Sequence, residues 1–307
     1  MYYIYILRTS ANTLYIGQTN NLERRLKEHF DKKSKAAKYT RSFETLTLVY
    51  QEEYETRNEV MRRERQVKKW PKAKKEALIT GSIKSKMKDV ITDVSILGAG
   101  DMAKGIGTRL VAGGNNVTFF DRNTEKAQGL QKELTQVATG EVVVASKRLG
   151  ESLSGEIVIL AIPYEAVPGV IEQYGDELVG KILVDITNPV NFENFTLTTP
   201  PGSSAAEEIA KMVPGNTKVV KSFNTTFSGT LVEGVINGKP LDVFIAGDNN
   251  EAKGVVANLI ESGGLRAIDA GPLESARALE GMQLIHIRLQ EQLGTNWMSG
   301  IQITSEV

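Results

Sequence analysis

Five side chains in the first 64 residues have types and spacings suited to phosphodiester hydrolysis. That reaction needs a base or an aligned water, a cation at the developing negative charge, and usually a metal held by a carboxylate. Tyr5 and Tyr15 lie ten positions apart, so a hairpin would set them side by side. Arg25 and His29 are four positions apart and share one face of a helix. Glu64 supplies a carboxylate, although each of these residues alone is more often structural.

The surrounding pattern predicts the elements that would carry these side chains. Aromatic and β-branched runs predict three strands, and an Asn20 or Asn21 cap predicts a helix that ends near Phe30. A second helix is expected to stop before Pro71, and a short basic helix follows it. The expected strands are Tyr2–Arg8, Thr13–Gln18 and Leu46–Tyr50, and the later helices are Arg57–Trp70 and a segment ending at Ile79. Residues 1–82 are therefore predicted to form a small mixed α/β domain with an antiparallel sheet.

Two short motifs give this region a family resemblance. Tyr15–Gly17 reads YIG, and Tyr3–Tyr5 stands where a GIY motif belongs, with tyrosine in place of its glycine. With the KYTR run at 38–41, residues 1–80 resemble the compact single-domain GIY-YIG nucleases. The resemblance implies that Tyr15 helps to activate water, Arg25 stabilises the transferring phosphate and Glu64 binds Mg²⁺ or Mn²⁺. It gives Tyr5 and His29 supporting catalytic roles.

Charge divides the chain in the same way. Residues 1–88 hold 21 Lys and Arg against 10 Asp and Glu, a net charge of +11, and the remainder holds 16 against 27, a net charge of −11. The basic half suits a polyanion, which predicts DNA as its partner and binding that weakens as salt rises. No base-reading motif is present, so recognition of DNA structure is expected, and binding without cleavage remains an alternative. The cations expected to track phosphate are Arg62, Arg63, Arg65, Lys68, Lys69, Lys72, Lys74 and Lys75.

Beyond a predicted linker at residues 83–92, a glycine-rich motif opens the second domain, residues 93–307. A short apolar strand runs into a G-x-G-x-x-A fingerprint made of Gly98, Gly100 and Ala103, with Asp101 and Met102 inside it. The first glycine permits a tight turn, the second lets a pyrophosphate approach the backbone, and the alanine lets the following helix pack closely. This context predicts NAD(P)(H) binding.

The preference between the two cofactors stays open. Asp121 ends the next predicted strand, 21 residues after Gly100, where a carboxylate accepts hydrogen bonds from a free ribose 2′-hydroxyl. That favours NAD(H). Arg122 follows directly and can pair with the 2′-phosphate of NADP(H).

Six apolar runs alternate with amphipathic stretches after residue 93, which predicts a doubly wound parallel-sheet Rossmann fold. Polar segments at 161–164, 185–189, 222–225 and 269–273 are expected at the ligand-binding ends of the strands. With the VKSFNT run, they make the region resemble the coenzyme F420-dependent NADP oxidoreductases, or deazaflavin reductases. The resemblance implies nicotinamide contacts from Ile162, Pro163 and Asn224, and a deazaflavin or flavin co-substrate. Hydride transfer needs no general acid.

A final helix is expected over Glu274–Leu293, and its apolar stripe predicts either core packing or a homodimer interface. His286 on this helix is expected to pack rather than react.

The chain has no cysteine and two histidines, which excludes disulfides and thiolate chemistry and argues against a His-rich zinc site. With no secretory signal and no membrane-length apolar run, the expected location is the cytoplasm. The sequence favours a bifunctional nuclease and oxidoreductase, with a dinucleotide-sensing regulator of the nuclease as an alternative.

Overall fold

The chain forms two compact units, Met1–Lys88 and Asp89–Val307. The computed structural model describes residues 1–31, 40–43, 45–54, 56–70, 72–79, 92–138 and 141–304. The predicted linker, apart from its last residue Thr92, lies outside the described residues, as do Lys38 and Tyr39 of the KYTR run. No helix in the described part is long and apolar enough to cross a membrane.

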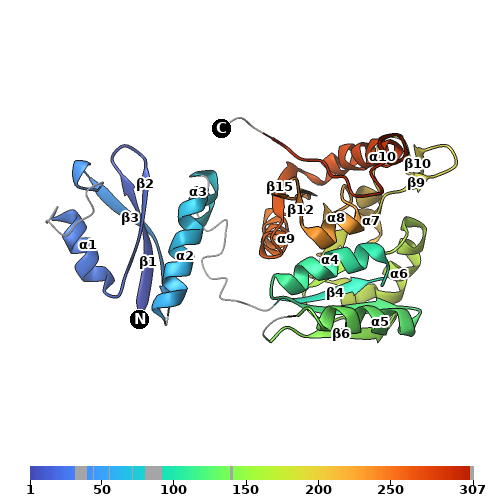
Figure 1. Cartoon of the computed structure of the whole chain (residues 1–307), viewed down its shortest axis with the longest axis horizontal. Coiled ribbons are helices and arrows are strands. Elements are labelled where there is room, and N and C mark those ends of the chain that lie inside the picture. Colours follow the sequence, from blue (N-terminus) through green and yellow to red (C-terminus); the bar gives the residue numbers. More distant parts are fainter. Residues whose placement is uncertain are drawn as a thin grey trace. The chain divides into compact units, whose positions relative to one another are not determined.

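The first unit is a three-stranded antiparallel sheet with helices on both faces (Figure 1). β1 is central and pairs with β2 on one side and β3 on the other. Asn21 caps the first helix, as one of the two predicted residues. The elements are β1 (Tyr2–Thr9), β2 (Leu14–Thr19), α1 (Leu22–Phe30), the 3₁₀ turn η1 (Thr40–Ser42), β3 (Leu46–Tyr54), α2 (Arg57–Lys69) and α3 (Lys72–Ile79).

Strand alternation separates the two faces of this sheet. Ile4 and Ile6 of β1 pack in the apolar core with Val60 and Val67 of α2. Tyr5 lies between those isoleucines in sequence, so its ring points to the opposite face, where α1 lies. Tyr3, which replaces the glycine of the GIY motif, pairs regularly with both neighbouring strands, so a side chain is accommodated there.

The second unit is a doubly wound α/β domain whose helices cover both faces of one sheet (Figure 1). Its eight-stranded sheet has the order β15-β14-β11-β8-β7-β4-β5-β6. The strands of this sheet are β4 (Asp93–Leu97), β5 (Asn116–Asp121), β6 (Val144–Arg148), β7 (Ile157–Leu160), β8 (Ile182–Asp185), β11 (Lys218–Ser222), β14 (Asp242–Ala246) and β15 (Arg266–Gly271). Its α-helices are α4 (Asp101–Ala112), α5 (Thr124–Thr135), α6 (Val167–Tyr174), α7 (Ala205–Met212), α8 (Ser228–Glu233), α9 (Asn250–Ser262) and α10 (Ala276–Leu293).

Short elements connect these helices and strands. They form two small hairpins and three 3₁₀ turns. They are β9 (Val190–Asn191), β10 (Thr196–Leu197), β12 (Val235–Ile236), β13 (Lys239–Pro240), η2 (Tyr164–Ala166), η3 (Gly175–Leu178) and η4 (Leu273–Ser275).

The sheet departs from an all-parallel arrangement at one junction. β11 and β14 are antiparallel, whereas every other pair of neighbours is parallel. The six strands from β11 to β6 therefore end at a common edge. The segment 269–273, predicted at that edge, ends a strand that runs in the opposite direction and leads instead into α10.

Candidate functional sites

In the first unit, four of the five predicted catalytic side chains gather around a buried tyrosine. Tyr5 is fully buried, and its hydroxyl lies 2.8 Å from His29 Nε2 and accepts a bond from Arg25 Nε at 3.2 Å. The Tyr5 and Tyr15 ring centroids are 6.3 Å apart, and Tyr15 and His29 are 5.2 Å apart. Because Tyr5 pairs with Gly17 and Tyr15 with Leu7, the two tyrosines are diagonal neighbours on one face.

The cluster has a defined protonation state at neutral pH. Burial, with the nearby Arg25 charge, lowers the pKa of His29 to about 4, so its imidazole is neutral. Burial raises the pKa of Tyr5, so its hydroxyl keeps its proton. If that proton is donated to His29 Nε2, the imidazole carries its own on Nδ1 and donates it to Thr40 Oγ1, 2.9 Å away. His29 is then the neutral proton acceptor of the cluster.

Glu64 lies on a different helix from Arg25 and His29. It is on α2, which packs on the isoleucine face of the sheet, and its carboxylate pairs with Lys68 at 2.9 Å. Among the described residues, no group of three or more acidic, histidine or cysteine side chains is placed to hold a metal. Metal binding by Glu64 stays a prediction, and water and phosphate oxygens would have to supply further ligands.

Arg63, one of the cations expected to contact phosphate, instead pairs with a buried carboxylate. Arg63 packs over the Trp70 ring and donates three hydrogen bonds to Glu52, which is 2% exposed. Tyr50 and Tyr54 also donate to that carboxylate. Arg63 therefore neutralises a buried acid and is not available to DNA, whereas Arg62, Arg65 and Lys68 on the same helix are exposed.

In the second unit, the glycine loop after β4 is shaped for a close ligand. Gly98 has φ +111°, and a Cβ there would lie 2.1 Å from the Ala161 carbonyl oxygen, so only glycine fits. At Gly100, which caps α4, a Cβ would meet nothing nearer than Lys126 Nζ at 3.9 Å. Ala103 is fully buried in the core, as the fingerprint predicts. The α4 N-terminus, which begins with Asp101 and Met102, therefore faces open space above the loop.

Asp121 ends β5 beside this loop and binds the backbone with both carboxylate oxygens. Oδ2 accepts from Ala99 N and Oδ1 from Asn123 N, each at 2.9 Å. The carboxylate thus orders the glycine loop, in addition to any contact with a ribose. Arg122 is exposed next to it.

A hollow of about 360 Å³ opens beyond β7 in the same unit. Ile162 and Pro163 follow β7, and the next residue, Tyr164, lines the hollow together with Pro168 and Met212. Burial and the surrounding carboxylates raise the pKa of Tyr164. The hollow therefore adjoins the segment expected to contact the nicotinamide, and its walls include a neutral phenol and apolar side chains.

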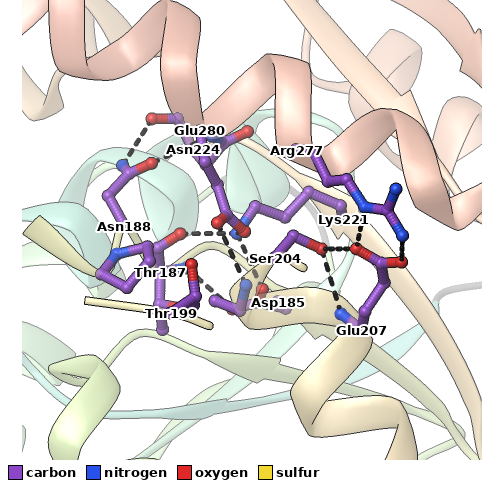
Figure 2. Close-up of polar contacts among 12 residues, drawn as sticks. Asp185, Thr187, Asn188, Thr199, Ser204, Glu207, Lys221, Asn224, Arg277 and Glu280 are labelled. Carbon is purple, nitrogen blue, oxygen red and sulfur yellow. Dashed lines mark hydrogen bonds and ion pairs between the residues drawn. The ribbon is translucent and has the colours of Figure 1, made fainter. Parts of the chain in front are cut away.

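A buried charge cluster underlies the ends of β8 and β11 (Figure 2). Lys221 is fully buried and donates to Asp185 at 2.8 Å, Glu280 at 2.7 Å and the Thr187 carbonyl at 2.6 Å. Glu280 reaches this point from α10 and also accepts from Ala205 N at the start of α7. Burial raises the pKa of Glu280.

Comparison with known proteins separates the same two units. Residues 1–77 match the GIY-YIG catalytic domain, and residues 93–189 match the NADP oxidoreductases that are coenzyme F420-dependent. A UPF0213 protein of Natronomonas pharaonis is 40% identical over 78 residues, which cover 25% of this chain and 89% of that protein. The F420-dependent NADP reductase of Methanocaldococcus jannaschii is 32% identical over 222 residues, covering 69% of this chain and 98% of the relative.

The chain therefore joins a GIY-YIG domain to a member of the F420-dependent NADP reductase family. A crystal structure from Arthrobacter sp. FB24, described as that of an F420-dependent NADP reductase, superimposes on the reductase unit with a TM-score of 0.61 and 27% identity. It covers 70% of this chain and all of the compared one. The metalloreductase STEAP3 of Rattus norvegicus is 36% identical over 191 residues, but this chain spans only 36% of its length.

The reductase unit fits a dinucleotide in its own geometry. Gly98 closes the turn, Gly100 leaves room above the backbone, and the buried α4 helix begins at that point. Asn224 Oδ1, at the end of β11, is a buried oxygen with no hydrogen-bond partner in the described structure. Both observations suit a ligand lying across the ends of β4 to β11, with its phosphates on the glycine loop.

Two features of these sites were not identified from the sequence. Thr40 holds the second nitrogen of His29, and its only sequence signal is its place in the KYTR run. Lys221 and Glu280 lie 59 positions apart, so their ion pair forms only when the chain folds and leaves no local pattern in the sequence. A lysine inside the apolar run KVVKSF was the available clue to a buried ion pair. The contacts of His286 agree with the expected packing role. Its ring centroid lies 4.5 Å from that of Phe227, and its Nε2 forms a hydrogen bond with the Ser299 hydroxyl.

Proposed function

We propose that the second unit transfers hydride between NADP(H) and a deazaflavin or flavin acceptor. The observation that carries this is the open cradle above Gly100 at the α4 N-terminus. The hollow lined by Tyr164, Pro168 and Met212 is large enough to admit part of a second ligand. The cofactor would lie on the loop residues Gly98, Gly100, Asp101, Met102 and Ala103, with its adenosine ribose near Asp121 and Arg122. Its nicotinamide would contact Ile162, Pro163 and Asn224.

A side chain at Gly100 tests this placement. The backbone there has φ −85°, which any residue adopts, so Gly100→Val adds volume without strain. We expect the dissociation constant for NADPH to rise about a hundredfold or more, as phosphate contacts are lost. Unchanged NADPH binding by a folded Gly100→Val protein would contradict the placement. For the acceptor, NADPH oxidation at 340 nm is followed with F420, FMN or riboflavin, and no transfer to any of them would rule out this substrate class.

We also propose that the first unit is a metal-dependent, structure-selective DNA endonuclease. Its support is the contact of Tyr5, Tyr15, Arg25 and His29 around one buried hydroxyl, in a unit of net charge +11. Tyr15 would align the attacking water, Arg25 the phosphate charge, and Glu64 an Mg²⁺ or Mn²⁺ ion. Tyr5 would hold the cluster, and the neutral imidazole of His29 would receive a proton.

Two substitutions with a matched control test the nuclease. Glu64→Ala in the full chain should abolish cleavage of branched DNA in Mg²⁺ while DNA binding persists, because the metal serves the transition state. Arg25→Ala should lower turnover about a hundredfold, the usual effect of losing one preorganised charge contact. Arg24→Ala, an exposed neighbour on the same helix, should change turnover only slightly. A loss confined to a few-fold in Arg25→Ala would make that residue part of a solvated face, and DNA binding without any cleavage would favour a tethering domain.

A further inference from the structure

Three buried oxygens at the ends of β8 and β11 lack hydrogen-bond partners. They are Thr187 Oγ1, Asn224 Oδ1 and Thr225 Oγ1, in residues no more than 4% exposed. Within the described residues, the one other such side-chain atom is Arg109 Nε. More than nine in ten buried polar groups are normally bonded, so three orphans in two adjacent segments point to a missing partner.

These segments are held firmly by buried charges and amides. The peptide of Thr187 is bonded on both sides, because its N–H donates to Asp185 at 2.8 Å and its carbonyl accepts from Lys221 at 2.6 Å. Asn188 and Asn224 exchange two bonds, Asn188 Nδ2 to the Asn224 carbonyl and Asn224 Nδ2 to Asn188 Oδ1 (Figure 2). The amide nitrogen of Asn224 is thereby occupied, and its oxygen is left as an acceptor.

The backbone before Asn224 is strained as well. Phe223 is buried with φ +57°, a left-handed conformation that is uncommon for an aromatic residue. Such conformations persist where surrounding structure imposes them, and they gather at ligand sites. Here the carbonyl of Phe223 accepts from Thr226 N at 3.1 Å and from Thr226 Oγ1.

We propose that Thr187, Asn224 and Thr225 form a subsite for the edge of an amide or imide, an N–H beside a carbonyl. The Asn224 oxygen can only accept, so it requires a donor such as an N–H, and each threonine hydroxyl can accept an N–H or donate to a carbonyl. Two groups of this chemistry belong to the proposed reaction, on which the inference rests: the carboxamide of the nicotinamide and the pyrimidinedione of a flavin-like acceptor. β8 neighbours β7, whose end carries Ile162 and Pro163, so the subsite adjoins the expected hydride-transfer position.

The first test is the stability of the ligand-free chain. An orphaned hydroxyl costs desolvation without a compensating bond, so Thr187→Val should raise Tm by roughly 2–4 °C. The control is Thr230→Val, because the buried Thr230 hydroxyl donates to the Phe227 carbonyl at 2.8 Å, and its loss should lower Tm. Unfolding is followed by Trp297 fluorescence in a Trp70→Phe background. Thr225→Val repeats the test at the second hydroxyl. Both variants losing stability as Thr230→Val does would overturn the proposal, because the hydroxyls would then already be bonded.

The second test is binding, with one arm for each source of the amide edge. In the cofactor arm, the unmodified protein should bind NADP⁺ about tenfold more tightly than its 3-acetylpyridine analogue, in which a methyl replaces the carboxamide NH₂. In Thr187→Val or Thr225→Val that preference should shrink to roughly threefold or less if the lost hydroxyl accepts the N–H. If the hydroxyl donates to the carbonyl, which both ligands carry, the affinity for both should fall together by about tenfold. In the acceptor arm, the same comparison uses riboflavin and N3-methylriboflavin, which lacks the imide N–H.

The outcomes separate this inference from the proposed function. A preference that collapses in either arm supports the subsite and identifies its occupant. A protein that binds both classes of ligand, but whose threonine variants keep both the preferences and the affinities of the unmodified protein, refutes the subsite and leaves the proposed function standing. A chain that binds no dinucleotide and no flavin refutes both.

Discussion

At His29 the imidazole lies between two hydroxyls, Tyr5 Oη at 2.8 Å and Thr40 Oγ1 at 2.9 Å. Both contacts use the neutral ring, since a protonated imidazole offers no acceptor to Tyr5. Burial is the largest cause of the low pKa of His29, about 4 against an ordinary 6.5, and the Arg25 charge adds to it. The protonation of His29 is therefore linked to the stability of its own unit.

This linkage predicts that the first unit loses stability in mild acid. As pH falls below 6.5 the unfolded chain binds a proton at His29, whereas the folded chain does not until about pH 4, so the free energy of unfolding falls. The loss should be about 2 kcal/mol between pH 7 and pH 5. Denaturant unfolding of a Trp297→Phe chain, followed by Trp70, measures it. A His29→Gln chain is the control, and an equal slope with pH in both proteins would refute the prediction.

At Asp121 the structure adds a second task to the one expected from the sequence. Its carboxylate orders the loop by accepting a hydrogen bond from Ala99 N. Its negative charge would still repel a 2′-phosphate placed nearby. Replacing it with the small polar Asp121→Ser should therefore shift the ratio of NADH to NADPH dissociation constants about tenfold or more toward NADPH. Absolute affinity for both should fall, because the loop loses a bond. Fluorescence titration measures both constants, with Glu125→Gln as a charge-loss control on the exposed start of α5. An unchanged ratio would assign Asp121 to the loop alone.

At the scale of elements, the β1–β2 hairpin explains why the YIG motif needs its glycine. A Cβ on Gly17 would lie 2.5 Å from the Tyr5 hydroxyl and 2.6 Å from its ring. Gly17→Ala should therefore displace Tyr5, destabilise the first unit by about 1–3 kcal/mol and reduce cleavage strongly. Gly129→Ala on α5, where a Cβ meets nothing, is the matched control and should be neutral or stabilising. Normal cleavage and stability in Gly17→Ala would show that the sheet relaxes around the methyl.

The elements themselves were largely predictable. Alternation in Tyr2–Thr9 and helical spacing in Leu22–Phe30 are local signals, and the boundaries agree with the predictions within a few residues. β6 was missed because Val144–Arg148 is a partly exposed edge strand with few apolar residues. The reversal of β14 and β15 was not predictable, since strand direction depends on chain crossings rather than on composition.

The candidate sites also differ in how far the sequence could predict them. The glycine loop could be located from the sequence, because its three small residues are close together and their spacing has one structural meaning. The Lys221 charge cluster and the orphaned threonine oxygens could not, since they depend on side chains brought together from β8, β11 and α10. Sequence placed Glu64 in the nuclease site by family resemblance, and its contact with the tyrosine cluster remains a prediction.

At the scale of the whole molecule, two compact units carry opposite charge, +11 over residues 1–88 and −11 over the rest. The hydrogen bonds of Tyr5, Asp121 and Lys221 described above each join residues of the same unit. Each proposed activity thus draws its named residues from one unit. The simplest consequence is that the two units act independently. The alternative is a dinucleotide sensor, in which cofactor binding to the second unit changes the rate of DNA cleavage by the first.

We expect saturating NADPH or NADP⁺ to change the rate of DNA cleavage by the full chain less than about twofold. Two ligands are coupled only when each biases a shared two-state element, and a tenfold effect corresponds to about 1.4 kcal/mol of coupling. Cleavage is measured at fixed ionic strength, because the cofactor's own charge and counterions weaken DNA binding. The control is Gly100→Val, which should lack the cofactor site. A large rate change in the unmodified chain that disappears in Gly100→Val would establish the sensor. The same change in both proteins would be competition between a polyanionic dinucleotide and DNA for the basic unit.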